Sequence, residues 1–151
     1  MFSETITATM PHKIKLIPKD QLISIIPLIK HLNPTLSETT LKTRLDEMLD
    51  QAYQCAGLYL DDQLIGICGF WIMTKFYVGK HIEPDNVFIL PEFRRQGLGR
   101  KLLEWVYDYG LSQGCIASEL NCYISNKKGD AFWEQEGFEK IGYHYQKQFE
   151  T

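Results

Sequence analysis

The segment that most constrains the fold is residues 94–101, Arg-Arg-Gln-Gly-Leu-Gly-Arg-Lys, which follows the apolar run 87–90. An apolar run, two glycines and then an amphipathic stretch predict a strand, a turn and the start of a helix. The first N–H groups of a helix have no intrahelical partner and lie at the positive end of its dipole, so they bind anions. Because Gly97 and Gly99 carry no side chains there, the sequence predicts a phosphate or pyrophosphate site.

Two common phosphate-binding loops do not fit this spacing. A Walker loop requires Lys and then Ser or Thr after its last glycine, but Gly99 is followed by Arg100, Lys101 and Leu102. A dinucleotide fingerprint requires a third glycine where Leu102 stands. Both mismatches argue against a nucleotide-dependent protein.

The spacing that does fit is Arg/Gln-x-x-Gly-x-Gly, formed by residues 94–99. This segment resembles the acetyl-coenzyme A signature of the GNAT superfamily of N-acetyltransferases. The residues before it, 89–93 (Ile-Leu-Pro-Glu-Phe), are similar to the family's strand end, Val-x-Pro-x-Tyr/Phe.

A second segment supports the same resemblance. Residues 126–138 are similar to the family motif Asn-x-x-Ala-x-x-Phe-Tyr-x-x-x-Gly-Phe, with Asn126 first and Gly137 near its end. Gly129 replaces the alanine and Trp133 replaces the tyrosine of this motif. The two motifs have the family's order and separation.

Length and composition bound the class of protein. The 151 residues suit one domain, and 44% hydrophobic with 23% charged residues is ordinary for a soluble globular chain. A net charge of -3 gives no support for a nucleic-acid or membrane partner.

We expect a cytoplasmic protein with a flexible tail at residues 1–12 and a single acetyltransferase domain at residues 13–151. No signal peptide or spanning segment is expected, and the four cysteines, without a C-x-x-C pair, are expected to be small thiols, mostly buried.

Periodicity predicts the order β-α-α-β-β-β-α-β-α-β. We expect Asp20 to cap the first helix, with a break at Pro27, and Ser37 to cap the second. The order indicates an α/β (α+β) fold with a mixed, mostly antiparallel sheet and helices on both faces, as the resemblance also implies. The expected strands are residues 13–17, 55–60, 64–77, 82–90, 116–123 and 139–149; the later helices start at Leu98 and span residues 127–136.

The resemblance implies acetyl-CoA as cosubstrate, with a strand backbone binding its pantetheine arm and the helix start its pyrophosphate. The cofactor-binding residues implied are Val87, Phe88, Ile89, Arg94, Arg95, Gln96, Gly97, Leu98, Gly99, Arg100, Asn126 and Trp133. No metal is expected.

Acetyl transfer to an amine requires removal of a proton from an ammonium whose pKa is near ~10.4. Asp85 lies two residues before the pantetheine strand segment, where relatives often carry an acid, and Glu83 shares its face by alternation. We therefore expect Asp85, and second Glu83, as the base or amine-orienting group, although surface charges at a strand end are an open alternative.

The leaving thiolate lacks its usual proton donor. Many relatives use a tyrosine where this chain has Trp133, and an indole N–H cannot act as an acid. Possible substitutes are Tyr123, Tyr143, His144 and Tyr145, with packing as the default role of the tyrosines.

The resulting hypothesis is an N-acetyltransferase that moves the acetyl group of acetyl-CoA directly to a primary amine, of a small molecule or a peptide N-terminus, in a ternary complex. The alternative is a coenzyme A-binding module with little or no catalysis. Trp71, Phe76 and Tyr77 are expected to line an aromatic wall for the amine or to pack in the core. The acceptor's identity, and whether the protein is a monomer or a homodimer, stay open.

Overall fold

The structure is a computed structural model that describes residues 12–150, and it divides the chain into two compact units, Met1–Ser118 and Glu119–Thr151. Apart from His12, which belongs to the first strand, the tail predicted at residues 1–12 lies outside the described residues. The single domain predicted over residues 13–151 stays a prediction. Each unit is described by itself.

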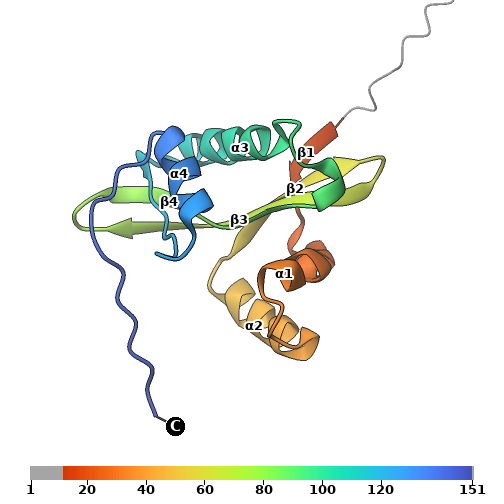
Figure 1. Cartoon of the computed structure of the whole chain (residues 1–151), viewed down its shortest axis with the longest axis horizontal. Coiled ribbons are helices and arrows are strands. Elements are labelled where there is room, and N and C mark those ends of the chain that lie inside the picture. Colours follow the sequence, from red (N-terminus) through yellow and green to blue (C-terminus); the bar gives the residue numbers. More distant parts are fainter. Residues whose placement is uncertain (1–11, 151) are drawn as a thin grey trace, which may run out of the picture. The chain divides into compact units, whose positions relative to one another are not determined.

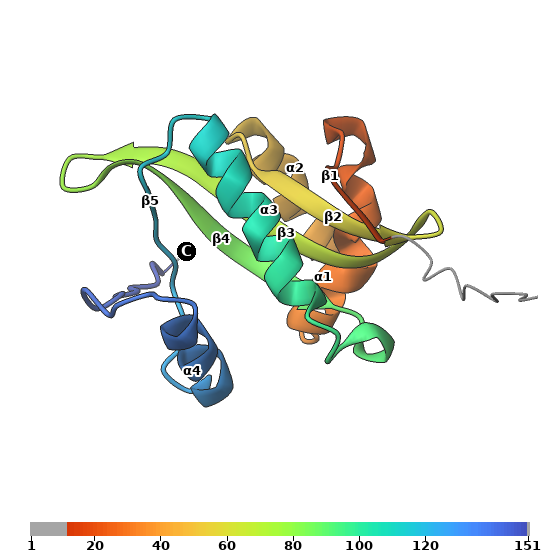
Figure 2. The same ribbon diagram turned by 90° about the horizontal axis from the view of Figure 1, so that it is seen from above.

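The first unit is a curled five-stranded sheet with helices on both faces. Its sheet order is β1-β2-β3-β4-β5; neighbouring strands are antiparallel except β4 and β5, which are parallel. Helix α3 covers one face, and α1 and α2 cover the other (Figure 1). Figure 2 shows α3 crossing the strands obliquely. The predicted fold class is confirmed. The elements are β1 (His12–Leu16), the 3-10 helix η1 (Lys19–Ile25), α1 (Ile26–Leu32), α2 (Glu38–Asp50), β2 (Gln54–Leu60), β3 (Gln63–Lys75), β4 (Gly79–Ile89), the 3-10 helix η2 (Pro91–Phe93), α3 (Leu98–Ser112) and β5 (Ala117–Ser118).

Local sequence explains most element boundaries. The Ser37 hydroxyl accepts from the Thr40 N–H at 3.1 Å, which confirms the predicted cap of α2. Pro27 lies in the first turn of α1, where its missing N–H costs nothing. The prediction that Asp20 caps the first helix is wrong: the chain enters a 3-10 helix after Pro18, with no side-chain cap.

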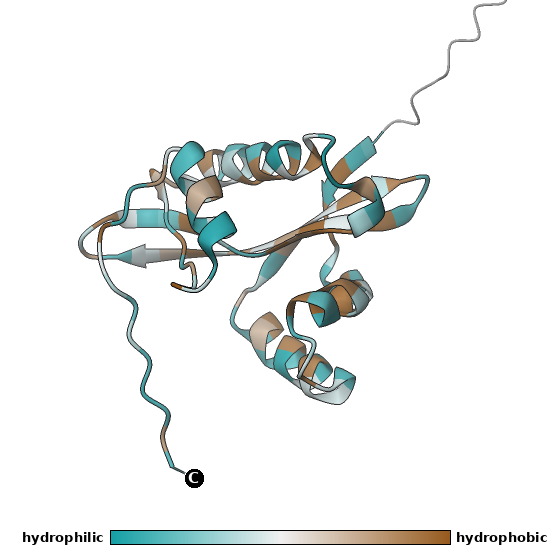
Figure 3. Cartoon of the chain, viewed as in Figure 1, coloured by the Kyte–Doolittle hydropathy of each residue, from teal (hydrophilic) through white to brown (hydrophobic). Residues whose placement is uncertain are grey.

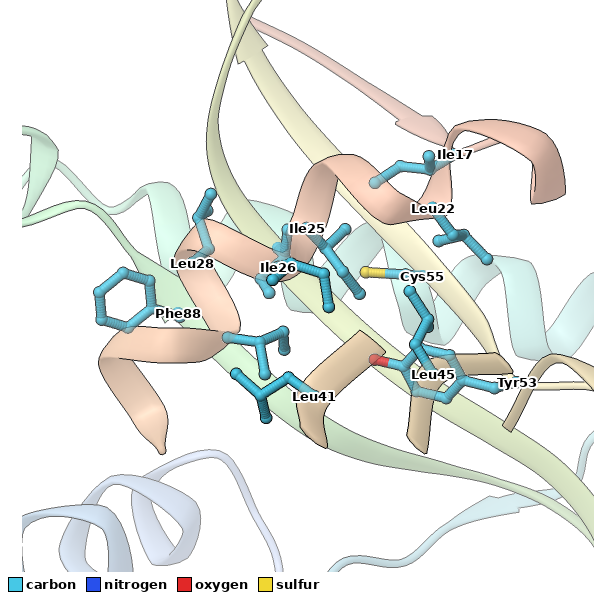
Figure 4. Packing of buried hydrophobic residues seen from close by; sticks show 12 residues of the cluster. Ile17, Leu22, Ile25, Ile26, Leu28, Leu41, Leu45, Tyr53, Cys55 and Phe88 are labelled. Carbon is cyan, nitrogen blue, oxygen red and sulfur yellow. The ribbon is translucent and has the colours of Figure 1, made fainter. Parts of the chain in front are cut away.

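Apolar side chains are buried on both faces of the sheet, and one core cluster lies between the sheet and the α1–α2 layer. Apolar side chains of these helices pack against β2, β3 and β4 (Figure 4), and α1 is apolar over much of its length (Figure 3). On the other face, Gly110 of α3 lies so close to β4 that a Cβ there would meet Ile82 Cγ2 at 2.9 Å. The core cluster consists of Ile17, Leu22, Ile25, Ile26, Leu28, Ile29, Leu41, Leu45, Tyr53, Cys55, Ile67 and Phe88.

The cysteines behave as small apolar residues. Cys55 and Cys68 are fully buried, Cys115 is nearly so and Cys122 is half-buried. Burial raises the pKa of the Cys55 thiol to about 12, so the thiol stays protonated at neutral pH and is a poor nucleophile.

The second unit contains α4 (Lys127–Gln135), closed at both ends by local bonds. The Asn126 side chain accepts from the Gly129 N–H at 3.0 Å, and a Cβ at Gly129 would lie 2.4 Å from the Asn126 amide nitrogen. Glycine in place of the family's alanine thus makes room for this cap. Gly137, at φ 94°, ends the helix as predicted, and the Phe138 N–H donates to Trp133 O at 3.0 Å.

Two predicted strands are not borne out. Of residues 116–123 only Ala117–Ser118 form a strand, and residues 139–149 form none. Ile141, Tyr143 and Tyr145 are exposed there, although they alternate as in a strand. Within residues 12–150, no helix combines the length and apolar character needed to cross a membrane.

Candidate active site

The candidate site is built around a bulge in β4. Residues Asp85 and Asn86 stand opposite the single residue Gly69 of β3, so β4 has one residue more than its partner here. Such a bulge sharpens the local twist and turns two successive side chains out of simple alternation. The flanking partners are Cys68 with Val87 and Phe70 with Pro84.

Both bulge residues are anchored by aromatic residues from outside β4. The Trp71 indole N–H donates to Asp85 Oδ2 at 2.9 Å, and the Tyr53 hydroxyl donates to Asn86 Oδ1 at 2.9 Å. The Tyr53 and Trp71 rings lie 5.1 Å apart at a tilt of 57°. The Asp85 carboxylate is exposed but held at one oxygen, which leaves its other oxygen to meet a ligand.

Tyr53 serves this arrangement as a neutral donor. It is 3% exposed, and burial raises the pKa of its hydroxyl well above the ordinary value. The group therefore keeps its proton at physiological pH and does not act as an acid or base.

Gly69 makes the position of Tyr53 possible, which gives a first prediction. A Cβ at residue 69 would lie 1.8 Å from Tyr53 Oη, so Gly69→Ala is expected to displace the buried ring from Asn86 and to lower the free energy of unfolding by about 1–3 kcal/mol. Urea unfolding measures this. Gly142→Ala, at an exposed position with nothing within 4 Å, is the control. Equal midpoints for both variants and the wild type would contradict the role given to Gly69.

Glu83 lies two residues before Asp85, opposite Trp71 of β3, and has different partners. Its Oε1 is 3.0 Å from His81 Nε2 and 3.6 Å from Lys75 Nζ. The Glu83 side chain is 17% exposed. The two predicted carboxylates are therefore brought together on β4, one anchored by a neutral indole and the other by basic groups.

After the bulge, main-chain groups of β4 point away from β3. The Leu90 N–H donates to Ile65 O at 2.8 Å, towards β3. Because successive residues of an antiparallel strand direct their main-chain groups to opposite sides, those of Val87 and Ile89 point to the outer edge. The pairing recorded for β5 (Ala117–Ser118) is with the earlier part of β4. The outer edge of this segment thus has no strand partner among residues 12–150.

Arg94 folds back onto this end of β4. Its Nε donates to Ile89 O at 2.9 Å, and its guanidinium carbon lies 5.1 Å from the centroid of the Phe88 ring. His31 at the end of α1 stacks on the same ring, with centroids 5.0 Å apart. The arginine is therefore fixed beside the strand edge that leads into the glycine turn.

The glycine turn forms as the sequence predicts. Gly97 is the N-cap of α3 at φ 71°, a left-handed conformation that favours glycine, and no side chain caps the helix there. Arg95 is also left-handed, at φ 66°. A Cβ at Gly99 would have no neighbour closer than 4.0 Å, so the fold itself does not require a glycine. Uncapped N–H groups beside open space fit an anionic group.

The other predicted residues do not all join this site. Trp71 lies against Asp85, but Phe76 and Tyr77 are exposed at the β3–β4 hairpin, and Phe76 is five residues, about 16 Å of strand, from Trp71. The three do not line one wall. Asn126 and Trp133 belong to the second unit, where Asn126 caps α4 and the Trp133 ring packs edge-on against Phe132 and Phe138.

Three residues of the site were not singled out from the sequence: Tyr53, His81 and Asn86. Tyr53 and His81 are buried, and their importance depends on partners in other elements or on strand position. Gly69 in the middle of a strand was the available signal, because an internal strand glycine often marks a bulge or a close approach.

Comparison with known proteins gives a consistent result. The model of the Acetyltransferase (GNAT) family matches residues 24–138. A glucosamine 6-phosphate N-acetyltransferase of Arabidopsis thaliana is 27% identical, covering 90% of this chain and 95% of that protein. A thialysine N-epsilon-acetyltransferase of Mus musculus is 25% identical over 65 residues; the match covers 43% of this chain and only 38% of the relative.

Solved structures show the same fold. An aminoglycoside N-acetyltransferase, AAC(6')-Iy, in complex with CoA superposes with a TM-score of 0.77 at 21% identity, covering 92% of this chain and 96% of that one. A ribosomal-protein-alanine N-acetyltransferase from Brucella melitensis gives 0.76 at 18% identity, covering 92% and 100%. At these identities the likeness is one of architecture.

Proposed function

The chain belongs to the acetyltransferase (GNAT) family, and from this we propose that it transfers the acetyl group of acetyl-CoA directly to a primary amine in a ternary complex. The observation that carries the proposal is the order of three features along the chain. The Asp85 carboxylate, the outward main-chain groups of Val87 and Ile89 and the uncapped start of α3 follow one another along the first unit.

The cosubstrate is proposed to contact two of these features, the outer edge of β4 and the start of α3. Main-chain N–H and C=O groups of Val87 and Ile89 pair with the amides of the pantetheine arm as a neighbouring strand would. Phe88 contributes its side chain, because its own main-chain groups face β3. The pyrophosphate binds the first N–H groups of α3, with the arginines of residues 94–100 beside it. Asn126 and Trp133 are assigned to the cosubstrate on the family motif alone.

Asp85 is proposed to accept a proton from the acceptor's ammonium group, directly or through water. The ammonium nitrogen has three protons and the amide product keeps one, so two must leave: one ends on the departing thiolate and the other goes to solvent. Acetyl-CoA supplies the thioester carbonyl that the neutral amine attacks. Trp71 holds the Asp85 carboxylate in one orientation, and Glu83, the second candidate, orients the ammonium.

A second candidate function is a coenzyme A-binding module with little catalysis. It is favoured by Trp133, whose indole cannot protonate a thiolate and whose ring packs against Phe132 and Phe138. The missing acid is a modest handicap, since a thiol of pKa ~8.5 is a tolerable leaving group near neutral pH. We therefore rank catalysis first.

Two measurements test the proposal. Calorimetry with acetyl-CoA tests binding, and release of free thiol over a panel of amines tests turnover. Amines named by the relatives belong on the panel: thialysine, glucosamine 6-phosphate, an aminoglycoside and a peptide with N-terminal alanine. We expect binding and turnover of at least one amine. Binding without turnover favours the binding module, and no binding overturns both.

A further inference from the structure

His81 is a buried histidine that the chemistry above does not use. Its side chain is 0% exposed, and in the sheet it lies between Met73 of β3 and Ala117 of β5. A buried polar group that is left unpaired destabilises the fold. An aliphatic side chain could fill this central strand position without needing hydrogen bonds. The partners of the imidazole therefore indicate why a histidine is present.

Both ring nitrogens have partners on β4 itself. Nδ1 lies 3.0 Å from Gly79 O, two residues before, and Nε2 lies 3.0 Å from Glu83 Oε1, two residues after. Residues 79, 81 and 83 share one face of the strand. The histidine therefore links the beginning of β4 to the carboxylate of Glu83.

Each of the two contacts of the imidazole requires a proton. A carbonyl oxygen only accepts, so Nδ1 must carry a proton. If Nε2 and Oε1 both lacked one, two lone pairs would face each other at 3.0 Å. One proton therefore lies between His81 and Glu83, either on the imidazole or on the carboxyl group.

Lys75 contacts the same oxygen of Glu83, since its ammonium nitrogen lies 3.6 Å from Oε1. Two basic side chains, one from β3 and one from β4, therefore contact the same oxygen of the Glu83 carboxylate.

We propose that His81 is a positioning residue: its imidazole bonds Oε1 of Glu83 and holds that carboxylate in one orientation on β4, two residues before Asp85. The role rests on the proposed acetyl transfer, in which the acceptor's ammonium group meets two anchored carboxylates. Asp85 accepts the proton and Glu83 orients the nitrogen.

The bond is tested by nitrogen NMR of the wild-type protein labelled with 15N-histidine. We expect the Nε2 signal of His81 to shift in Glu83→Gln, because the group that this nitrogen contacts changes. A His81 Nε2 signal that is unchanged in Glu83→Gln would overturn the proposal. This measurement needs no substrate.

The positioning role is tested by kinetics of two variants. His81→Leu removes both bonds and is expected to lower kcat with the amine by about 10- to 100-fold, with KM for acetyl-CoA unchanged. His81→Gln keeps an N–H donor towards Glu83 and should restore part of kcat. His12→Gln, an exposed histidine on β1, is the control. Wild-type kcat in both variants, or a change in thermal stability alone, counts against the role.

The proposed function can fail separately. If the wild type acetylates no amine, the acetyltransferase proposal falls, while the NMR spectrum still decides whether His81 and Glu83 are bonded. If the wild type is active and the His81 variants match it, only the inference about His81 is lost.

Discussion

Replacing Gly99 by leucine is expected to abolish acetyl-CoA binding without harming the fold. A Cβ at this position has no neighbour closer than 4.0 Å, and leucine favours a helix over glycine by up to about 1 kcal/mol. The added side chain would instead occupy the space in front of the first N–H groups of α3. We expect the dissociation constant to rise by at least about 100-fold, or ~2.7 kcal/mol, with an unchanged or higher Tm.

Calorimetry and thermal unfolding of the same preparation separate these two effects. Gly142→Leu is a matched control, because that glycine also has open space around it but lies away from α3 in sequence. Unchanged acetyl-CoA affinity in Gly99→Leu would mean that the diphosphate does not bind at this helix start. A large loss of stability would mean that the glycine serves the fold.

The Asp85→Asn variant is expected to lower kcat/KM for the amine by about 10²- to 10⁴-fold, the usual worth of a positioned acid or base. The amide oxygen can still accept the Trp71 N–H bond that the carboxylate accepts at 2.9 Å, so the bulge and the fold should be retained. The thiol-release assay measures the loss, and calorimetry should give an unchanged acetyl-CoA affinity.

Two further variants make this prediction specific. Asp108→Asn removes an exposed carboxylate from α3 and should leave kcat/KM unchanged. Trp71→Phe keeps an aromatic ring but removes the N–H that orients Asp85, so its kcat/KM should fall between those of the wild type and Asp85→Asn. Activity of Asp85→Asn equal to that of the wild type would remove Asp85 from catalysis.

The features that the sequence predicted well are those with local causes. Ser37 caps α2 through a hydroxyl three residues from its donor, and Gly97 begins α3 because a left-handed residue is needed there. The 3-10 helix η1 gives way to α1 at Ile26, next to Pro27, which lies in the first turn of α1. The order of α1, α2 and β1–β4 followed from periodicity, since one buried face per element repeats within a few residues.

The features that it missed depend on partners far along the chain. Alternation predicts a strand over residues 139–149, but a strand also needs a neighbouring strand to bond, and these residues form none. The bulge at Asp85 and Asn86 is visible only against Gly69, and the bond from Tyr53 to Asn86 spans 33 residues. His81 carries no signal of burial in its own sequence context.

The outer side of β4 has a consequence for handling the purified protein. Exposed strand edges promote aggregation by pairing with other chains, and natural proteins counter this with proline and charge. Pro84 lies on β4 with Glu83 and Asp85 beside it, but the following segment, Val-Phe-Ile, carries neither safeguard. We expect the ligand-free protein to precipitate more readily on concentration than the protein saturated with coenzyme A, which light scattering would register.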